Sequence, residues 1–101
     1  MSKGSASKNL DAFSRLRGLH SAFVPTVLRE GPYRVYFYSN ESGEPPHVHI
    51  DHENATAKFW LDPVVLASNV GFSARELGSI EEIVNRNRKR LIRAWHEHFG
   101  I

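Results

Sequence analysis

The stretch EPPHVHID, residues 44–51, sets two imidazoles and a carboxylate at alternate positions of the chain. Side chains alternate between the two faces of a β-strand, so His47, His49 and Asp51 share one face if this stretch is extended. The valine and isoleucine between them then share the other face and point to the core. Imidazoles exchange protons near neutral pH and also bind metal ions. The motif therefore predicts a polar surface capable of acid–base or metal chemistry.

The strands predicted at 33–38 and 55–62 add cations and aromatic rings to that surface. Both segments are rich in the β-branched and aromatic residues that favour strands. Their apolar alternate positions, such as Val35 and Phe59, are expected to turn inward, which leaves the other positions on the outward face. The predicted outward patch contains His47, His49, Asp51, Arg34, Tyr36, Tyr38, Lys58 and Trp60.

One interpretation of this patch is general acid–base chemistry on a phosphodiester. His47 and His49 would accept and return protons, as paired acid and base groups do. Arg34 and Lys58 would hold the phosphate and stabilise its developing charge. A ribonuclease can carry out such a reaction without a metal ion. This interpretation therefore predicts RNA as the substrate and neither a metal nor another cofactor.

Two other interpretations stay open on the residues alone. In one, His47 and His49 chelate a metal ion, because an H-x-H pair on one strand face can bind one ion. Further ligands would then come from Asp51, His52, His96 or His98. The last two cannot both face one site, since positions two apart on a helix diverge by about 200°. In the other, the patch only binds, through aromatic rings and cations that suit nucleic acid or a partner protein.

The elements that must position the patch are indicated by hydrophobic periodicity and turn signals. Strands are predicted at 26–29, 33–38, 47–51 and 55–62, while 64–68 fits either an edge strand or a helical turn. A capping box at Ser73 and Glu76 begins a long helix that is expected to run from 74 to about 98. These elements predict an α+β fold: a three- to four-stranded antiparallel sheet with a long C-terminal helix packed on one face, and an optional N-terminal helix.

The long helix sorts its residues into an apolar stripe and a cationic strip. With about 100° per residue, the stripe contains Leu77, Ile80, Val84, Leu91 and Trp95, which should face the sheet. The opposite strip contains Arg86, Lys89, Arg90 and Arg93. Arg88 lies at the edge of the stripe, where its guanidinium must find a carboxylate or a phosphate. It is therefore a further candidate for binding.

Length and composition limit the class of protein. The chain has 101 residues, which fits one domain, and no cysteine, which excludes disulfides and thiolate metal sites. Its net charge is +2 and its pI about 9.2, so binding to nucleic acid is permitted but not required. No apolar run approaches the roughly 20 residues that span a bilayer. We expect a cytoplasmic protein without a membrane partner, with an extension at 1–24 that could hold a short helix and a single domain at 25–101.

Several segments together carry a resemblance to a known family. They are PTVLREGPYRVYFYSNESGEPPHVHI, from residue 25, and then AKFWLDPV, GFSARE and LIRAWHEHFG. This series resembles a small bacterial family of unknown function that is marked by a PPHxH motif after a tyrosine-rich strand and by a late tryptophan. The motif is matched by residues 45–49 and the tryptophan by Trp95. Residues 1–23 depart from the family pattern.

The resemblance implies a genetic context more than a reaction. Members are often encoded beside another small protein, in an arrangement that looks like a toxin–antitoxin pair, and the family has no assigned reaction. The motif histidines carry over to His47 and His49. We therefore expect a cognate small protein as partner, with the chain acting either as an RNA-acting toxin or as a non-catalytic antitoxin-like or regulatory module. The oligomeric state is not predicted.

Overall fold

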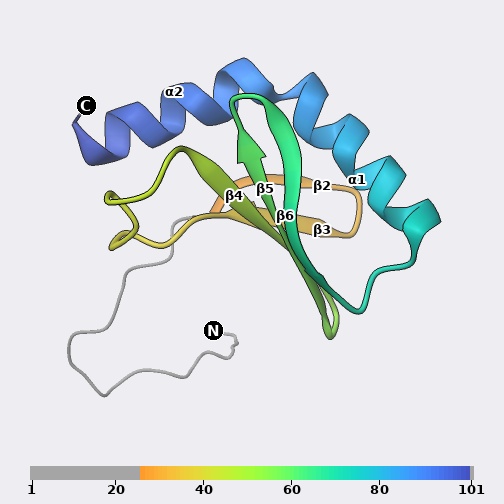
Figure 1. Cartoon of the computed structure of the whole chain (residues 1–101). Helices are drawn as coiled ribbons and strands as arrows, with labels where there is room; N and C mark the ends of the chain where they lie inside the picture. The colour runs from red at the N-terminus through yellow and green to blue at the C-terminus, as the bar shows by residue number, and fades with distance from the viewer. Residues whose placement is uncertain (1–25, 101) are drawn as a thin grey trace.

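The computed structural model describes residues 26–100, which form one antiparallel sheet followed by two helices (Figure 1). The sheet has five strands in chain order, so each strand pairs with the one before it. The strands are β2 Thr26–Glu30, β3 Tyr33–Tyr36, β4 His47–His52, β5 Ala55–Leu61 and β6 Val64–Val70. The helices are α1 Ala74–Arg86 and α2 Arg88–Phe99. The short helix predicted within 1–24 lies outside the described residues.

The sheet is one strand wider than the three to four strands that the sequence predicts. The extra strand is β6, in the segment that fits either a strand or a helical turn by sequence. It pairs along its whole length with β5, from Thr56 opposite Val70 to Leu61 opposite Val64. Backbone pairing with β5 therefore decides its conformation, because most of its side chains are exposed and supply little packing preference.

The single long helix predicted from 74 to about 98 is divided at Asn87. This residue has φ −105° and ψ 12°, outside the helical range. Its side-chain amide donates to the carbonyl of Ile83 over 2.8 Å and to Glu30 Oε1 over 3.2 Å. These bonds tie the junction to the end of β2. Asparagine side chains compete in this way with regular helix bonding, which accounts for the break.

The helix ends largely agree with the sequence signals. Ser73 Oγ accepts a hydrogen bond from the backbone N–H of Glu76 over 3.1 Å, which is one half of the predicted capping box. The carboxylate of Glu76 accepts instead from the hydroxyl of Tyr33 over 2.8 Å, and so links α1 to the sheet. Gly100 takes the left-handed conformation with φ 71° just past α2, as glycine commonly does at a helix C-terminus.

The core lies between one face of the sheet and the two helices, which run along the same side of it (Figure 1). The prediction that Val48 and Ile50 of β4 face the helices is confirmed, because both are buried in the same cluster as the helix stripe. The prediction that His47 lies on the surface is wrong, because Trp60 and Trp95 cover it and its side chain is 0% exposed. The cluster includes Val35, Val48, Ile50, Ala57, Phe59, Leu61, Ile80, Val84 and Leu91. The alternate positions of β3, β4 and β5 are thereby left for the opposite face. Across residues 26–100, no helix has the length and apolar character to span a membrane.

Candidate functional site

The strand register places side chains of three strands next to one another on the outward face. His49 of β4 lies opposite Tyr36 of β3 on one side and Lys58 of β5 on the other. His47 lies opposite Trp60, one pleat further along. Directly opposite residues have Cβ atoms about 5 Å apart, so these side chains are neighbours. These members of the predicted patch are therefore neighbours, although His47 and Tyr36 are buried and do not form part of the surface.

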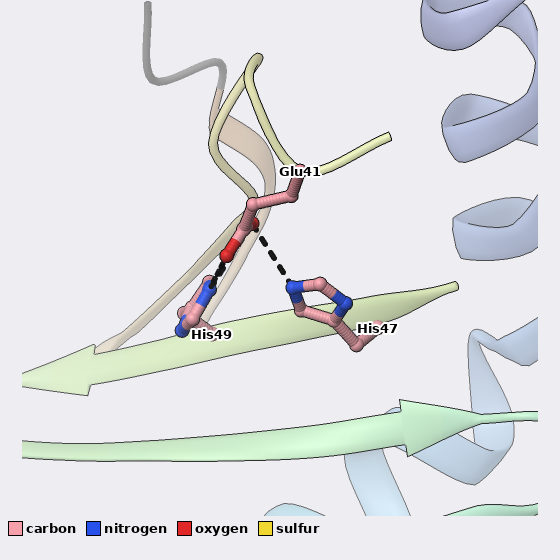
Figure 2. Close-up of side chains that lie close together, drawn as sticks. All are labelled: Glu41, His47 and His49. Carbon is pink, nitrogen blue, oxygen red and sulfur yellow. Dashed lines mark hydrogen bonds and ion pairs between the residues drawn. The ribbon is translucent and has the colours of Figure 1, made fainter. Parts of the chain in front are cut away.

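A loop carboxylate that no sequence pattern indicated joins the two histidines. Glu41 lies in the connection between β3 and β4, and its side chain reaches between the imidazoles (Figure 2). Glu41 Oε1 is 3.0 Å from His47 Nε2, and Glu41 Oε2 is 3.0 Å from His49 Nε2. We call these three residues the Glu–His–His cluster.

The backbone of the loop fixes the carboxylate of Glu41. Strand pairing of β3 ends at Tyr36, and the backbone N–H of Tyr38 then donates to Glu41 Oε1 over 2.9 Å. Burial alone would raise the pKa of Glu41. The Tyr38 N–H and the nearby imidazoles of His49 and His47 more than offset it, so the pKa of Glu41 lies below its usual value. The carboxylate is therefore ionised at neutral pH.

His47 is enclosed by aromatic rings and has a defined proton position. Its side chain is 0% exposed, and its ring centroid lies 4.9 Å from that of Trp95 and 5.6 Å from that of Trp60. Nδ1 is 2.9 Å from the carbonyl oxygen of Pro45. A carbonyl only accepts, so Nδ1 carries a proton and donates it. This bond turns Nε2 toward Glu41.

His49 is the more accessible imidazole of the cluster. Its side chain is 16% exposed and that of Glu41 14%. The ring stacks on Tyr36 with centroids 5.3 Å apart and meets the edge of Tyr38 at 5.0 Å. Its Nε2 hydrogen-bonds the Glu41 carboxylate. Solvent or a ligand would therefore meet His49 and Glu41 first, with His47 behind them.

The other predicted residues of the patch have partners of their own. Asp51 accepts from the hydroxyls of Tyr36, over 3.0 Å, and Thr56, over 2.7 Å. Lys58 Nζ lies 2.7 Å from Glu44 and 4.5 Å above the centre of the Trp60 ring. Asp51 is therefore part of the sheet's own hydrogen bonding, while Lys58 and Trp60 border the cluster.

The two predicted arginines lie away from the Glu–His–His cluster. Arg34 Nε donates to Thr26 Oγ1 over 2.7 Å, and its guanidinium lies 4.5 Å from the centre of the Tyr36 ring. Arg88 donates to the carbonyl of Leu61 over 2.8 Å and to Asp62 over 2.6 Å. The carboxylate expected at Arg88 is therefore Asp62, and the side chain ties α2 to the turn between β5 and β6.

The additional metal ligands considered from sequence do not gather at the motif. His52 lies near Glu76, 3.5 Å away, and His98 packs against Phe37 with ring centroids 5.3 Å apart. Within residues 26–100, the histidine and carboxylate group close enough to hold a metal ion consists of Glu41, His47 and His49. Glu41 carries no signal in the sequence, because it lies in a loop without periodicity, four residues before the motif begins at Pro45.

Tyr36 supplies a test of the packing around His49. Burial, then the charge of Asp51 and then the neighbouring Tyr38, raise the pKa of Tyr36 well above its usual 10.0. The folded state therefore holds the phenol proton more tightly than the unfolded state does. The contribution of the Tyr36 phenol to the free energy of unfolding is fully present below pH 10. It falls as the pH rises above 10, by up to about 1.4 kcal/mol per pH unit. Arg34 and His49 also face the ring.

Substitution Tyr36→Phe is expected to remove this part of the alkaline loss. Urea unfolding of both proteins between pH 8 and pH 11 measures it, and the other titrating groups cancel in the difference. The variant starts lower by about 1 kcal/mol, because it lacks the hydrogen bond to Asp51. Parallel pH profiles for the two proteins would contradict the burial of this hydroxyl.

Comparison with known proteins identifies the family and little else. A family model described as "Domain of unknown function (DUF4160)" matches residues 33–96, a range that includes the whole Glu–His–His cluster. No curated protein and no solved structure matches the chain. Since the family model covers more than half of the chain, this protein belongs to the DUF4160 family of domains of unknown function.

Proposed function

We propose that the protein is a histidine-dependent, RNA-acting enzyme, and that it is the toxin of a two-gene bacterial module resembling a toxin–antitoxin pair. The observation that carries the proposal is one carboxylate held between a buried imidazole, His47, and a partly exposed imidazole, His49. Cations and aromatic rings around it suit a nucleic-acid ligand.

The burial of His47 changes the catalytic roles that the two histidines would have. From sequence, both were expected to move protons. His47 is enclosed, so direct contact with RNA falls to His49. A carboxylate beside an imidazole orients it and stabilises its charged form, which assists a general base. In this proposal His49 takes the proton of the attacking ribose hydroxyl and returns it to the leaving oxygen, Glu41 orients His49, and His47 lies behind them.

Lys58 is the cation best placed to hold the phosphate. It lies directly opposite His49 in the register, and its present partner is the exposed carboxylate of Glu44. A phosphate could take the place of Glu44, because exposed ion pairs contribute little and exchange readily. Trp60 and Tyr38 offer faces on which bases can stack, each worth about 1–3 kcal/mol in single-strand complexes, whereas the ring of Tyr36 is covered by Arg34 and His49.

Substitution His49→Gln tests the proposal. Loss of a general base costs about 10²–10⁴-fold in rate, so cleavage of a labelled single-stranded RNA should fall at least 100-fold. His52→Gln is the matched control, because His52 lies on the same strand outside the cluster, and its rate should stay within about twofold. Circular dichroism confirms that both variants fold. Growth of cells that express each protein, with and without the neighbouring small protein, tests the toxin role.

A non-catalytic module that binds nucleic acid is the alternative, and a separate surface favours it. The α1–α2 junction borders a hollow of about 560 Å³ lined by Asn85, Arg86, Asn87, Arg88, Lys89, Arg90 and Arg93. Cations gathered around a concavity suit a phosphate backbone. In this alternative the parent protein binds RNA without cleaving it and does not inhibit growth, and His49→Gln leaves the binding unchanged. That set of results would overturn the enzymatic proposal.

A further inference from the structure

The nitrogen Nε2 of His47 is a buried polar atom that, within residues 26–100, lacks the hydrogen-bond partner such an atom normally has. It has no hydrogen-bond partner within the described part of the chain, although the side chain is 0% exposed. Because Nδ1 donates to Pro45, a neutral His47 presents a lone pair at Nε2. Glu41 Oε1 lies 3.0 Å from this nitrogen but off the direction of the lone pair, since the contact lacks hydrogen-bond geometry. Buried polar atoms in proteins almost always have a partner, so this one calls for an explanation.

Two electron-rich atoms at this distance repel each other unless something positive lies between them. One of the two is a carboxylate oxygen of Glu41, and the aromatic rings around His47 leave little room for water that would screen it. A proton on Nε2 would supply one positive charge, but the contact does not have the geometry of a hydrogen bond. A metal ion would supply the charge without needing that geometry, and it would also engage His49.

We propose that the Glu–His–His cluster binds a divalent transition-metal ion of the zinc type, with Glu41, His47 Nε2 and His49 Nε2 as its protein ligands. Zinc lies about 2.0–2.2 Å from nitrogen and carboxylate ligands, so tetrahedral donors are about 3.3–3.5 Å apart. In the cluster the carboxylate is 3.0 Å from each Nε2, and the ligand atoms of all three residues lie within 4.8 Å of one another. Small side-chain rotations suffice to bring them around one ion.

The surroundings of the cluster match those of metal sites. Metal-binding histidines usually donate their second ring N–H to a backbone carbonyl or a carboxylate, which orients the ring. His47 does this toward Pro45. Carboxylate ligands are in turn hydrogen-bonded, as Glu41 is by the N–H of Tyr38. The stacked rings of Tyr36 and Tyr38 restrain His49.

The donor set favours zinc over the hard cations. Two imidazoles and one carboxylate suit zinc and neighbouring transition metals, whereas Ca²⁺ and Mg²⁺ prefer oxygen ligands. Three protein ligands also leave the fourth position of a tetrahedral ion open, as in catalytic zinc sites. That position would face the exposed side of His49 and Glu41, since His47 is sealed by Trp60 and Trp95.

The role of the ion rests on the proposed function, whereas its binding does not. With both Nε2 atoms bound, His49 is no longer free to act as the base. A bound ion of this type would instead supply Lewis-acid chemistry at the site, by polarising a phosphate oxygen or a water. The ion thus replaces direct proton transfer by His49 as the chemistry of the same site.

Zinc binding to the chelator-stripped protein, in competition with a chromophoric chelator, tests the inference. We expect one Zn²⁺ per chain. Glu41→Gln and His49→Gln should each weaken binding by about 100-fold or more, because loss of supporting residues alone costs 10–100-fold. These side chains are partly exposed, so both variants should fold. His52→Gln and Glu44→Gln are the controls, and they should bind zinc within about threefold of the parent.

Titration with Co²⁺ adds a readout of geometry, since tetrahedral cobalt absorbs far more strongly in the visible range than octahedral cobalt does. No stoichiometric binding of Zn²⁺, or binding that survives both Glu41→Gln and His49→Gln, would overturn the inference. Zinc binding without any RNA cleavage would support the metal site and contradict the proposed function. RNA cleavage that persists in the stripped protein with chelator present would support the proposed function and refute a role for the ion.

Discussion

Substitution Trp95→Ala is expected to lower the free energy of unfolding by about 3–5 kcal/mol, the cost of a large cavity in a packed core. The indole is 0% exposed and packs against Phe37, Phe99 and His47, with ring centroids 5.2, 4.4 and 4.9 Å away. Its N–H has no hydrogen-bond partner within the described region, so the loss is one of packing. Urea unfolding followed by circular dichroism measures it.

The control for this prediction is Trp60→Ala on the opposite face. Trp60 is only partly buried, although it too contacts His47, and its removal should cost about 1–2 kcal/mol. A loss below about 1 kcal/mol for Trp95→Ala would mean that the last two turns of α2 do not pack on the sheet as described. The enclosure of His47 would then be wrong as well.

Substitution Val48→Asp is expected to unfold most of the protein. Val48 is 0% exposed and faces the helices from β4, between the two histidines of the motif. An unpaired carboxylate there costs at least about 4 kcal/mol, which approaches the whole stability of a small domain. Far-ultraviolet circular dichroism and urea unfolding at neutral pH report the outcome.

Val65→Asp is the matched control, because it makes the same chemical change at a position on β6 that is 49% exposed. It should change stability by less than about 1 kcal/mol. Comparable losses for the two variants would contradict the strand parity on which the whole site depends. If β4 were shifted by one residue, Val48 would be on the outer face and His49 would face the helices.

The sequence predicts which alternate residues of β4 face the helices, because only one of the two sets is apolar. In HVHID the apolar residues occupy alternate positions, and the structure buries Val48 and Ile50 among the helix residues. The helical stripe was equally clear, since Ile80, Val84, Leu91 and Trp95 recur at helical spacing and are all 0% exposed. Periodic patterns of this kind report which face is buried, whichever element lies opposite.

Features without periodicity could not be read in the same way. Glu41 enters the cluster through the conformation of a loop, which the backbone N–H of Tyr38 closes. The break at Asn87 depends on a side-chain bond to Ile83 and on a contact with Glu30, 57 residues away in the chain. Such non-local contacts exist only once the fold has formed, so the sequence pattern predicts the strand that carries the histidines but not the third member of their cluster.

Anomalous X-ray diffraction at the zinc absorption edge, from crystals grown with one equivalent of Zn²⁺, tests the role of the Glu–His–His cluster most directly. We predict a single strong peak about 2.0–2.2 Å from a carboxylate oxygen of Glu41 and from Nε2 of both His47 and His49. An empty cluster in such crystals, with His47 Nε2 hydrogen-bonded to Glu41 or the ring turned away, would contradict the metal site.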